Sequence, residues 1–300
     1  MSVITETKLN LPLFGRGKVR DTYDLGDRLL IVATDRISAF DFVLPNGIPD
    51  KGAVLNQLSA FWFEKTAHII PNHVVKVVTS PSMLAELASY GAPYPDYVTG
   101  RAMVVKKAER IPVECVVRGY ISGSAWVEYQ SKGTVTDTPL PPGLKESQLL
   151  AQPLFTPTTK AEAGHDEPLT PEHMESLVGK RLATDLKKAT ISVYEFARDY
   201  ARQRGIIIAD TKFEFGIIDG KLSLIDELLT PDSSRFWDVA RYQVGTSPSS
   251  FDKQPVRDWL VSSGWNKEPP TPILPPDVVK ATTQRYREAF RRLTGKELVT

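Results

Sequence analysis

The stretch IIIADTKFEFGIIDGKLSLIDE, residues 206–227, is the part of the chain that decides the fold. Two runs of β-branched and aromatic residues flank Asp219-Gly220, a dipeptide typical of a tight hairpin turn. Shorter apolar runs predict further strands at residues 28–34, 101–106 and 111–118. Helical spacing and capping residues predict helices at residues 52–70, 122–132, 170–204 (with a break near residue 179) and 277–294.

The first of the two β runs carries an unusual charged face. Asp210, Lys212 and Glu214 share parity, so a regular strand places them together, opposite Phe213. Burying such a face is unfavourable unless it meets water, a cation or a ligand. Glu214 and Asp226, on adjacent strands, are hard oxygen ligands that suit Mg²⁺. The alternative is a salt-bridged surface face in which Lys212 neutralises its neighbours.

A shared metal site depends on the register of this hairpin. With a two-residue loop, Ile218 pairs with Lys221, and Glu214 and Asp226 then lie on opposite faces. We therefore predict a three-residue loop or a bulge, which brings the two carboxylates to one face of the sheet.

Two other segments have residue types that bind phosphate. Glycines and cations are close together in residues 15–21, GRGKVRD, where backbone amides and cations can approach an anion. Arg118 precedes Ser122 and Ser124 at the start of a predicted helix, which is also suited to phosphate. The alternatives are a solvated turn for the first segment and simple helix capping by Ser122 for the second.

Asp232 and Arg235 follow the hairpin closely enough to line the same cleft, although an ordinary proline turn is the alternative. Upstream, the short polar segment at residues 107–110 connects two predicted strands and suggests a hinge. We place an N-terminal β-rich lobe at residues 1–110 and a larger lobe at residues 111–300.

Composition excludes several classes of protein. The 300 residues include 37 Lys and Arg against 36 Asp and Glu, so binding of nucleic acid through bulk positive charge is excluded. No apolar run approaches the roughly 20 residues of a membrane helix, so no membrane partner is expected. A single cysteine, Cys115, cannot form an internal disulfide, and no signal peptide is visible, which together favour a cytoplasmic location.

The combined motifs resemble the SAICAR synthetase family, in its longer, yeast-like form. The resemblance runs from about residue 13 to residue 293 and rests on residues 17–21, 33–41, 113–119, 122–124, 154–160, 208–216, 226–227 and 231–237. It implies an α+β, ATP-grasp-like and kinase-related fold in two lobes. Mostly antiparallel sheets with flanking helices, and an active site in the cleft between the lobes, are expected.

The resemblance also implies an activity, that of an ATP-dependent ligase in purine (IMP) biosynthesis. Such an enzyme joins L-aspartate to the carboxylate of carboxyaminoimidazole ribonucleotide through an acyl phosphate, and releases the succinocarboxamide, ADP and phosphate. ATP and Mg²⁺ are the expected cofactors, the partners are these small molecules, and a monomer is expected. The alternatives are a small-molecule kinase of related architecture and a nucleotide-sensing module without chemistry.

Roles for individual residues follow from the same resemblance. Nucleotide contacts are expected from Gly15, Gly17, Lys18, Arg20 and Lys106. Metal ligands are expected to be Glu214 and Asp226. Contacts to the ribonucleotide are expected from Arg118, Ser122, Ser124, Asp232 and Arg235. The catalytic residues beside the reacting carboxylate are expected to be Asp210 and Lys212. Residues 134–169 contain six prolines and are predicted to form a long loop. Positioning of L-aspartate or closure of this loop is expected from Asp41, Lys160 and His165.

Overall fold

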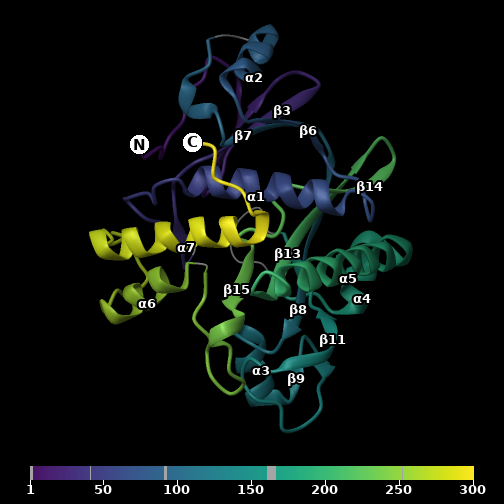
Figure 1. The fold of residues 1–300 in the computed structure, drawn as a ribbon. Coiled ribbons are helices and arrows are strands. Elements are labelled where there is room, and N and C mark those ends of the chain that lie inside the picture. The colour runs from purple at the N-terminus through teal and green to yellow at the C-terminus, as the bar shows by residue number, and fades with distance from the viewer. Residues whose placement is uncertain (1–2, 41, 91–92, 161–166, 252) are drawn as a thin grey trace.

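Two antiparallel sheets, one above the other in Figure 1, form the frame of the molecule. The computed structural model describes residues 3–40, 42–90, 93–160, 167–251 and 253–300. Within these residues every strand ladder is antiparallel, and helices lie between and around the sheets. This arrangement confirms the predicted α+β fold of mostly antiparallel sheets with flanking helices.

The first sheet has five strands in the order β1-β2-β3-β7-β6. They are β1 (Leu13–Arg16), β2 (Arg20–Asp24), β3 (Arg28–Ala33), β6 (Val74–Val78) and β7 (Ala102–Lys106). Buried side chains of β3 and β7, among them Leu30, Val32 and Val104, form a core against α2 (Pro81–Glu86) and the short helical turns η1 (Leu87–Tyr90) and η2 (Asp96–Val98).

The second sheet is built around one long central strand, β13 (Ile206–Ile218). On one side β13 pairs with β8 (Glu109–Tyr120), and on the other with β14 (Lys221–Ile225) and β15 (Ser234–Asp238). In turn β8 pairs with β11 (Leu149–Phe155) and β12 (Thr158–Thr159). Most apolar residues of β13 are buried, which explains why the run at 206–218 is so rich in Ile and Phe.

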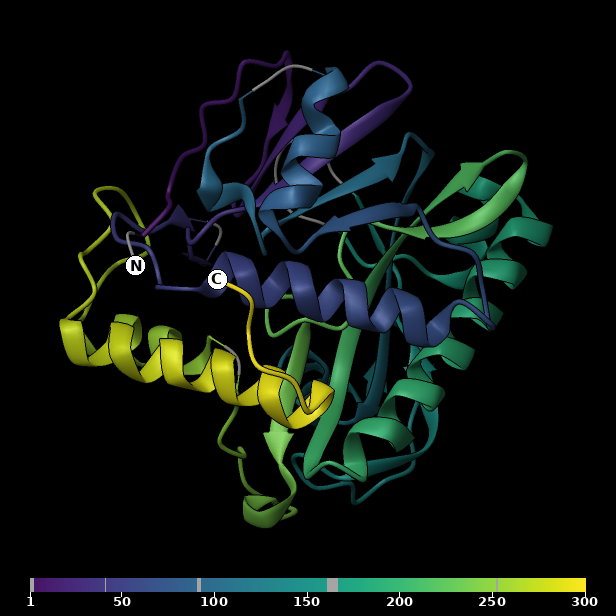
Figure 2. The ribbon, with the colours of Figure 1, turned by 45° about the horizontal axis from the view of Figure 1, so that its top comes forward.

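Helices fill the space between the sheets and cover the outer face of the second. Helix α1 (Lys51–Thr66) lies between the two sheets, and α7 (Pro276–Thr294) runs along it (Figure 2). Helix α5 (Lys180–Arg202) packs on β8 and β13, with α4 (Pro171–Val178) beside it. The remaining elements are α3 (Ser124–Lys132), α6 (Gln254–Ser262), the turn η3 (Val239–Arg241) and the strand pairs β4 (Ser38–Ala39) with β5 (Phe42–Val43) and β9 (Thr134–Val135) with β10 (Thr138–Pro139).

The predicted break near residue 179 is present. Thr170 caps α4 by accepting a hydrogen bond from the His173 amide, 3.2 Å away. Gly179 ends α4 at φ 84° and precedes the first residue of α5. An L-residue rarely adopts that φ, so the glycine allows one helical pattern in the sequence to become two helices.

The structure contradicts one interpretation of the sequence, the long loop at residues 134–169. Part of it is β11, which pairs with β8 through a register shift between Leu149 and Leu154. Pro153 lies within this strand, and a proline cannot donate to a ladder, so the strand tolerates it only at the edge of the sheet. The same proline hides the strand in the sequence.

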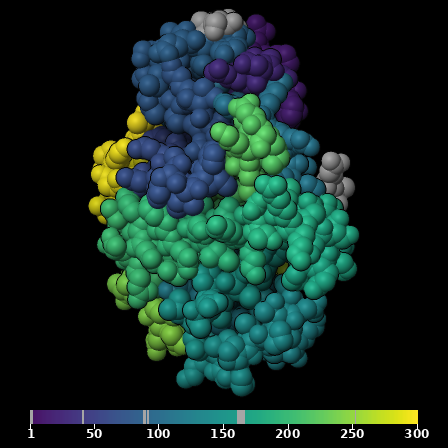
Figure 3. All heavy atoms as spheres, turned by 90° about the vertical axis from the view of Figure 1, so that its right-hand side faces the viewer, coloured from purple at the N-terminus to yellow at the C-terminus, as the bar shows by residue number. Residues whose placement is uncertain are grey.

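Two contacts join the sheets at the hairpin of β13 and β14. A bridge connects Asn72 with Leu224, and the His73 amide donates to the Leu224 carbonyl at 3.1 Å. At the tip, Nζ of Lys106 lies 2.8 Å from Oδ2 of Asp219. The space-filling view of Figure 3 shows this hairpin against the N-terminal sheet. Among the helices that the structure describes, none has the length and apolar character to cross a membrane.

Candidate active site

The charged face predicted for β13 exists. Side chains of Asp210, Lys212 and Glu214 are partly exposed, whereas the alternating Thr211 and Phe213 are buried. Consecutive charged positions on this face are about 6.6 Å apart, because a strand rises roughly 3.3 Å per residue. The face therefore offers three separate positions along one line, and each has its own partners.

At one end, Asp210 gathers two arginines. It lies opposite Arg118 on β8 and opposite Arg235 on β15, and one oxygen, Oδ2, accepts from both guanidinium groups, from Arg118 at 3.4 Å. Arg235 also donates to Ser122 Oγ at 2.9 Å, and Arg118 to Ser124 Oγ at 3.5 Å. The structure thus brings together four of the residues that the sequence assigned to the ribonucleotide. It places Asp210, expected beside the reacting carboxylate, among them.

We call Arg118 and Arg235, together with Ser122, Ser124 and Asp210, the arginine cluster. In it, two positive charges share a single carboxylate. Burial lowers the pKa of Arg118, Asp210 acts in the opposite direction, and Arg235 lowers it further by repulsion. Both arginines are partly exposed and they stand at the first turn of α3. The excess positive charge and the helix start together have the chemistry that suits a phosphate-sized anion.

Glycines allow the close approaches in this cluster. A Cβ on Gly119 would lie 1.8 Å from the Tyr194 hydroxyl, which donates to the Ile208 carbonyl at 2.8 Å. A Cβ on Gly123, whose φ is 58°, would lie 2.7 Å from Nη2 of Arg235. Gly123 therefore lets the guanidinium lie directly against the start of α3.

At the middle and far positions of the face, lysines alternate with carboxylates. Lys212 Nζ lies 2.8 Å from Glu114 Oε1, and Lys160 Nζ lies 3.0 Å from the same oxygen and 2.7 Å from Glu214 Oε1. Burial works against the charge of Glu114, but Lys212 and Lys160 hold its pKa below the usual range. Burial also opposes the charge of Lys160, yet Glu214 and Glu114 raise its pKa. Lys160, expected near L-aspartate, thus belongs to this carboxylate group.

The two predicted metal ligands lie within electrostatic reach of each other. Burial has the largest effect on the pKa of Glu214 and raises it, and the negative charge of Asp226 raises it further. Burial opposes the charge of Asp226, but Arg20 and then Lys160 lower its pKa. Two half-buried carboxylates so placed are hard oxygen donors of the kind that a divalent cation binds.

The hairpin that carries these two carboxylates differs from the prediction. The hairpin has a two-residue turn, with Ile218 paired to Lys221, so the predicted three-residue loop or bulge is wrong. Both turn residues have positive φ, which the right-handed twist of a hairpin favours. Asp226 lies just past the end of β14 with φ 65°, and this left-handed residue, instead of a shifted register, redirects the chain.

Arg20 occupies an unexpected place for a nucleotide contact. Its guanidinium pairs with Asp226 and, at 2.8 Å, with Glu227 Oε1. Burial works against its charge, but Asp226 and Glu227 raise its pKa. The segment at residues 15–21, the glycine loop, connects β1 and β2. Within it the Gly17 amide donates to the Arg20 carbonyl at 2.8 Å, and the exposed Lys18 lies at the tip.

No role was predicted for Arg36, which holds this loop in place. Its guanidinium donates to the Gly17 carbonyl at 2.9 Å and the Lys18 carbonyl at 3.2 Å, and pairs with Asp21 at 2.7 Å. Gly15 lies in β1, where the register shifts between Leu13 and Gly15. The loop is therefore held in shape by a buried arginine behind it.

Asp232 lies apart from the arginine cluster, although Arg235 is only three residues away. Its Oδ2 is 2.7 Å from Nζ of the fully buried Lys51, and its Oδ1 accepts from the Tyr286 hydroxyl at 2.6 Å. No short motif signals Lys51, which lies 181 residues away at the start of α1. Of the other predicted residues, Lys106 is half exposed beside Asp219, and Asp41 and His165 lie outside the described residues.

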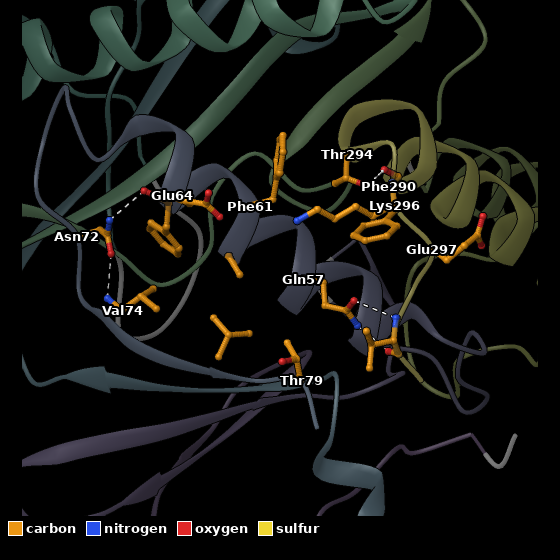
Figure 4. A pocket seen from close by; sticks show the side chains of 14 residues that line it. Gln57, Phe61, Glu64, Asn72, Val74, Thr79, Phe290, Thr294, Lys296 and Glu297 are labelled. Carbon is orange, nitrogen blue, oxygen red and sulfur yellow. Dashed lines mark hydrogen bonds between the residues drawn. The ribbon is translucent and has the colours of Figure 1, made fainter. Parts of the chain in front are cut away.

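A separate cavity of about 460 Å³ lies between α1, β6 and the C-terminal segment. Figure 4 shows Gln57, Phe61, Val74 and Phe290 around it, with Lys296 at its edge. None of the residues predicted for the site lines this cavity, so it is distinct from the charged face of β13.

Comparisons with known proteins agree on one family. The chain matches the SAICAR synthetase family over residues 13–272. A phosphoribosylaminoimidazole-succinocarboxamide synthase from Syntrophobacter fumaroxidans is 53% identical over 96% of this chain and 94% of its own length. One from Elusimicrobium minutum is 52% identical over 97% of this chain and 98% of its own.

Solved structures give the same result. SAICAR synthase from Saccharomyces cerevisiae, complexed with SAICAR, has a TM-score of 0.90 and 45% identity, covering 99% of this chain and 100% of its own. A SAICAR synthetase in complex with ADP has a TM-score of 0.68 and 25% identity, covering 94% of this chain and 98% of its own.

These similarities extend over nearly the whole chain, including each segment of the charged face and the arginine cluster. They confirm the resemblance to the yeast-like form and the prediction of a ligase of purine biosynthesis. The chain belongs to the SAICAR synthetase family.

Proposed function

We propose that the charged face of β13 carries out the family's reaction, joining L-aspartate to the carboxylate of carboxyaminoimidazole ribonucleotide with ATP. The observation that carries this proposal is the order of groups along one strand. An arginine–serine cluster lies at Asp210, a lysine at Lys212 and a carboxylate pair at Glu214 and Asp226. In the same order along the strand, these groups suit the substrate phosphate, the reacting carboxylate, and the nucleotide with its metal.

The ribonucleotide phosphate is assigned to the arginine cluster. Arg118 and Arg235 supply two guanidinium groups, and Ser122 and Ser124 supply hydroxyls at the start of α3. Guanidinium groups bind phosphate oxygens in pairs, which fixes orientation as well as charge. Asp210 accepts hydrogen bonds from both arginines, so it acts as a positioning residue for the phosphate site.

Lys212 is assigned to the carboxylate that reacts. A carboxylate is a poor electrophile because its negative charge repels an amine. Transfer of the terminal phosphoryl group of ATP to a carboxylate oxygen gives ADP and an acyl phosphate. The amine of L-aspartate then attacks the acyl carbon, the bond from carbon to phosphate oxygen breaks, and phosphate leaves as the amine loses a proton. Lys212 orients the carboxylate and offsets its charge.

The nucleotide is assigned to the glycine loop and the acidic group. Gly15, Gly17 and Lys18 offer backbone amides and an ammonium group, and Lys106 lies near the crossing between the sheets. Glu214 and Asp226 fit Mg²⁺ because they are hard oxygen donors that disfavour each other's charge. When bound, the ion would neutralise phosphate charge. Arg20 pairs with Asp226 and Lys160 with Glu214, so these cations offset the charge of the two carboxylates.

The relatives solved with SAICAR and with ADP support this assignment of a product site and a nucleotide site. We also propose the lobe boundary at residue 110, with the site between the lobes, because one sheet ends at Lys106 and the other begins at Glu109. A cytoplasmic monomer remains our proposal for location and assembly.

A coupled assay of ADP formation tests the proposal when each substrate is omitted in turn. We expect ADP only when ATP, the ribonucleotide and L-aspartate are all present. Steady ADP formation without L-aspartate would contradict the ligase assignment and would instead fit the small-molecule kinase.

A further inference from the structure

The N-terminal arm, residues 3–8, has no role in the assignment above, yet it is hydrogen-bonded to the segment that holds the glycine loop. The Asp35 amide donates to the Ile4 carbonyl at 2.7 Å, and the Ile4 amide donates to Oδ2 of Asp35 at 2.8 Å. Next along the arm, the Thr5 carbonyl accepts from Nη1 of Arg36 at 2.7 Å. The arm is thus fixed to the segment between β3 and β4, beside the arginine behind the loop.

Thr7 connects the arm to a residue of the glycine loop itself. Its hydroxyl donates to Oδ2 of Asp21 at 2.7 Å, and its amide donates to the same oxygen at 3.0 Å. The other oxygen of Asp21, Oδ1, accepts from Nη2 of Arg36 at 2.7 Å. Burial works against the charge of Asp21, but the hydrogen bonds from Arg36 and Thr7 hold its pKa below the usual range. This buried carboxylate therefore joins the arm to Arg36.

Arg36 turns this connection into a constraint on the backbone of the loop. It donates from Nη2 to the Gly17 carbonyl at 2.9 Å and from Nε to the Lys18 carbonyl at 3.2 Å. In a planar trans peptide the carbonyl and the amide of the next residue point in opposite directions. The amides of Lys18 and Val19 therefore face away from the buried guanidinium. Two successive amides on one side of a turn form a concave site for an anion such as phosphate.

We propose that the N-terminal arm is a positioning element of the nucleotide site. Through Thr7, Asp21 and Arg36 it fixes the two amides at the tip of the glycine loop in the direction of the ATP phosphates. This inference rests on the proposed function, which assigns the nucleotide to this loop. A loop held in its binding conformation loses less freedom when the ligand binds, and so binds it more tightly. Because the arm acts through the phosphate contacts, it should affect ATP and leave adenosine, which has no phosphate, unaffected.

Calorimetric titration of Thr7→Val with ATP and with adenosine tests this role. The variant keeps the shape of the side chain but loses the hydroxyl that donates to Asp21. We expect ATP affinity to fall about threefold to tenfold, as for one lost hydrogen bond, and the affinities for adenosine and the ribonucleotide to stay within about twofold. Thr7→Ser, which keeps the hydroxyl, should restore most of the ATP affinity. Thr5→Val, the same change on an exposed side chain of the arm, is the matched control and should alter none of these values.

A second variant, Arg36→Lys, keeps the positive charge and removes the fork of the guanidinium. An ammonium group cannot hold two loop carbonyls, the arm and Asp21 in the same geometry. ATP should therefore bind about tenfold or more weakly, again with little change for adenosine.

The comparison of ATP with adenosine separates this role from a merely structural one. The Thr7 hydroxyl also lies 2.8 Å from the Tyr23 hydroxyl, so Thr7→Val should lose some stability whether or not the arm affects the nucleotide site. Unchanged ATP affinity in Thr7→Val would overturn the inference while the ligase stands, even if Arg36→Lys binds ATP weakly. Equal losses for ATP and adenosine would also overturn it. A wild type that binds ATP no more tightly than adenosine would instead refute the proposed function of the glycine loop.

Discussion

Glu114 on β8 and Glu214 on β13 lie directly opposite each other, and the ammonium group of Lys160 joins them, 3.0 Å from one carboxylate and 2.7 Å from the other. Like charges at directly opposed positions of a sheet destabilise it unless a counter-charge lies between them. Lys160 supplies that charge. A divalent cation bound at this end of the site could therefore replace Lys160 as the positive charge between the two carboxylates.

Replacing Lys160 with Met should lower the free energy of unfolding by about 1–3 kcal/mol near neutral pH, because two largely buried carboxylates lose a shared cation. Lys160 and Lys212 hold the pKa of Glu114 low. Their stabilisation is therefore present above the ordinary glutamate pKa and is lost as the pH falls through the lowered value. The deficit of Lys160→Met should shrink on acidification, which urea denaturation at about pH 7 and about pH 4 measures.

The matched control is Lys107→Met, which removes a lysine from an exposed pair with Asp24. Exposed pairs contribute little, so this change should cost much less. An equal loss in the two variants, or a loss at Lys160 that is the same at both pH values, would show that the opposed carboxylates do not depend on Lys160.

Replacing Glu214 with Gln should weaken Mg²⁺-dependent nucleotide binding without loss of stability. Burial and Asp226 raise the pKa of Glu214, so its ionised form is disfavoured in the folded protein and stability falls as the pH rises above the ordinary glutamate range. The neutral amide removes that penalty. Calorimetric titration with ATP should show about a tenfold or greater loss of affinity when Mg²⁺ is present and little change in EDTA. Unchanged affinity in both conditions would remove Glu214 from the metal site.

Replacing Arg118 with Ala should impair ribonucleotide binding about tenfold or more and leave ATP affinity nearly unchanged, because the arginine cluster lies at the opposite end of the face from Glu214. Arg118→Lys should also bind poorly, since an ammonium group cannot reproduce the paired geometry of a guanidinium. Isothermal titration with each ligand measures this. Equal damage to ATP binding would mean that the two anion sites are one.

Replacing Gly123 with Ala should weaken ribonucleotide binding by displacing Arg235, whose Nη2 would be 2.7 Å from the new Cβ. Gly133, at the other end of α3, has a similar positive φ of 70° but nothing within 4 Å of a Cβ. Gly133→Ala therefore carries the backbone strain without the clash. A ribonucleotide affinity lowered only in Gly123→Ala is expected, and equal affinities in the two variants would contradict the role of Gly123.

Much of the site could be predicted because periodicity and parity are local properties. The alternation in residues 206–218 identified the central strand and showed that Asp210, Lys212 and Glu214 share a face. Likewise the order of Arg118, Ser122 and Ser124 at a helix start predicted a group that the structure does bring together. These inferences needed only neighbours in sequence.

Other features depend on distant or exceptional residues. The pairing of Lys51 with Asp232 spans 181 residues, and Lys51 itself looks like any helix-starting lysine. The hairpin prediction failed because it assumed that Asp226 continues a regular strand, whereas its left-handed backbone lies outside the strand and the rule of alternation. Asn and Asp are the non-glycine residues that tolerate this conformation, but their presence does not require it.

We propose that the ribonucleotide carboxylate at Lys212 is activated as an acyl phosphate before L-aspartate attacks it. The most direct measurement follows heavy oxygen from a labelled carboxylate of the ribonucleotide into the products. An acyl phosphate breaks between carbon and the bridging oxygen, so we predict that one labelled oxygen per turnover appears in inorganic phosphate. Release of unlabelled phosphate, with both labelled oxygens lost to water or kept by the ribonucleotide, would contradict an acyl phosphate intermediate.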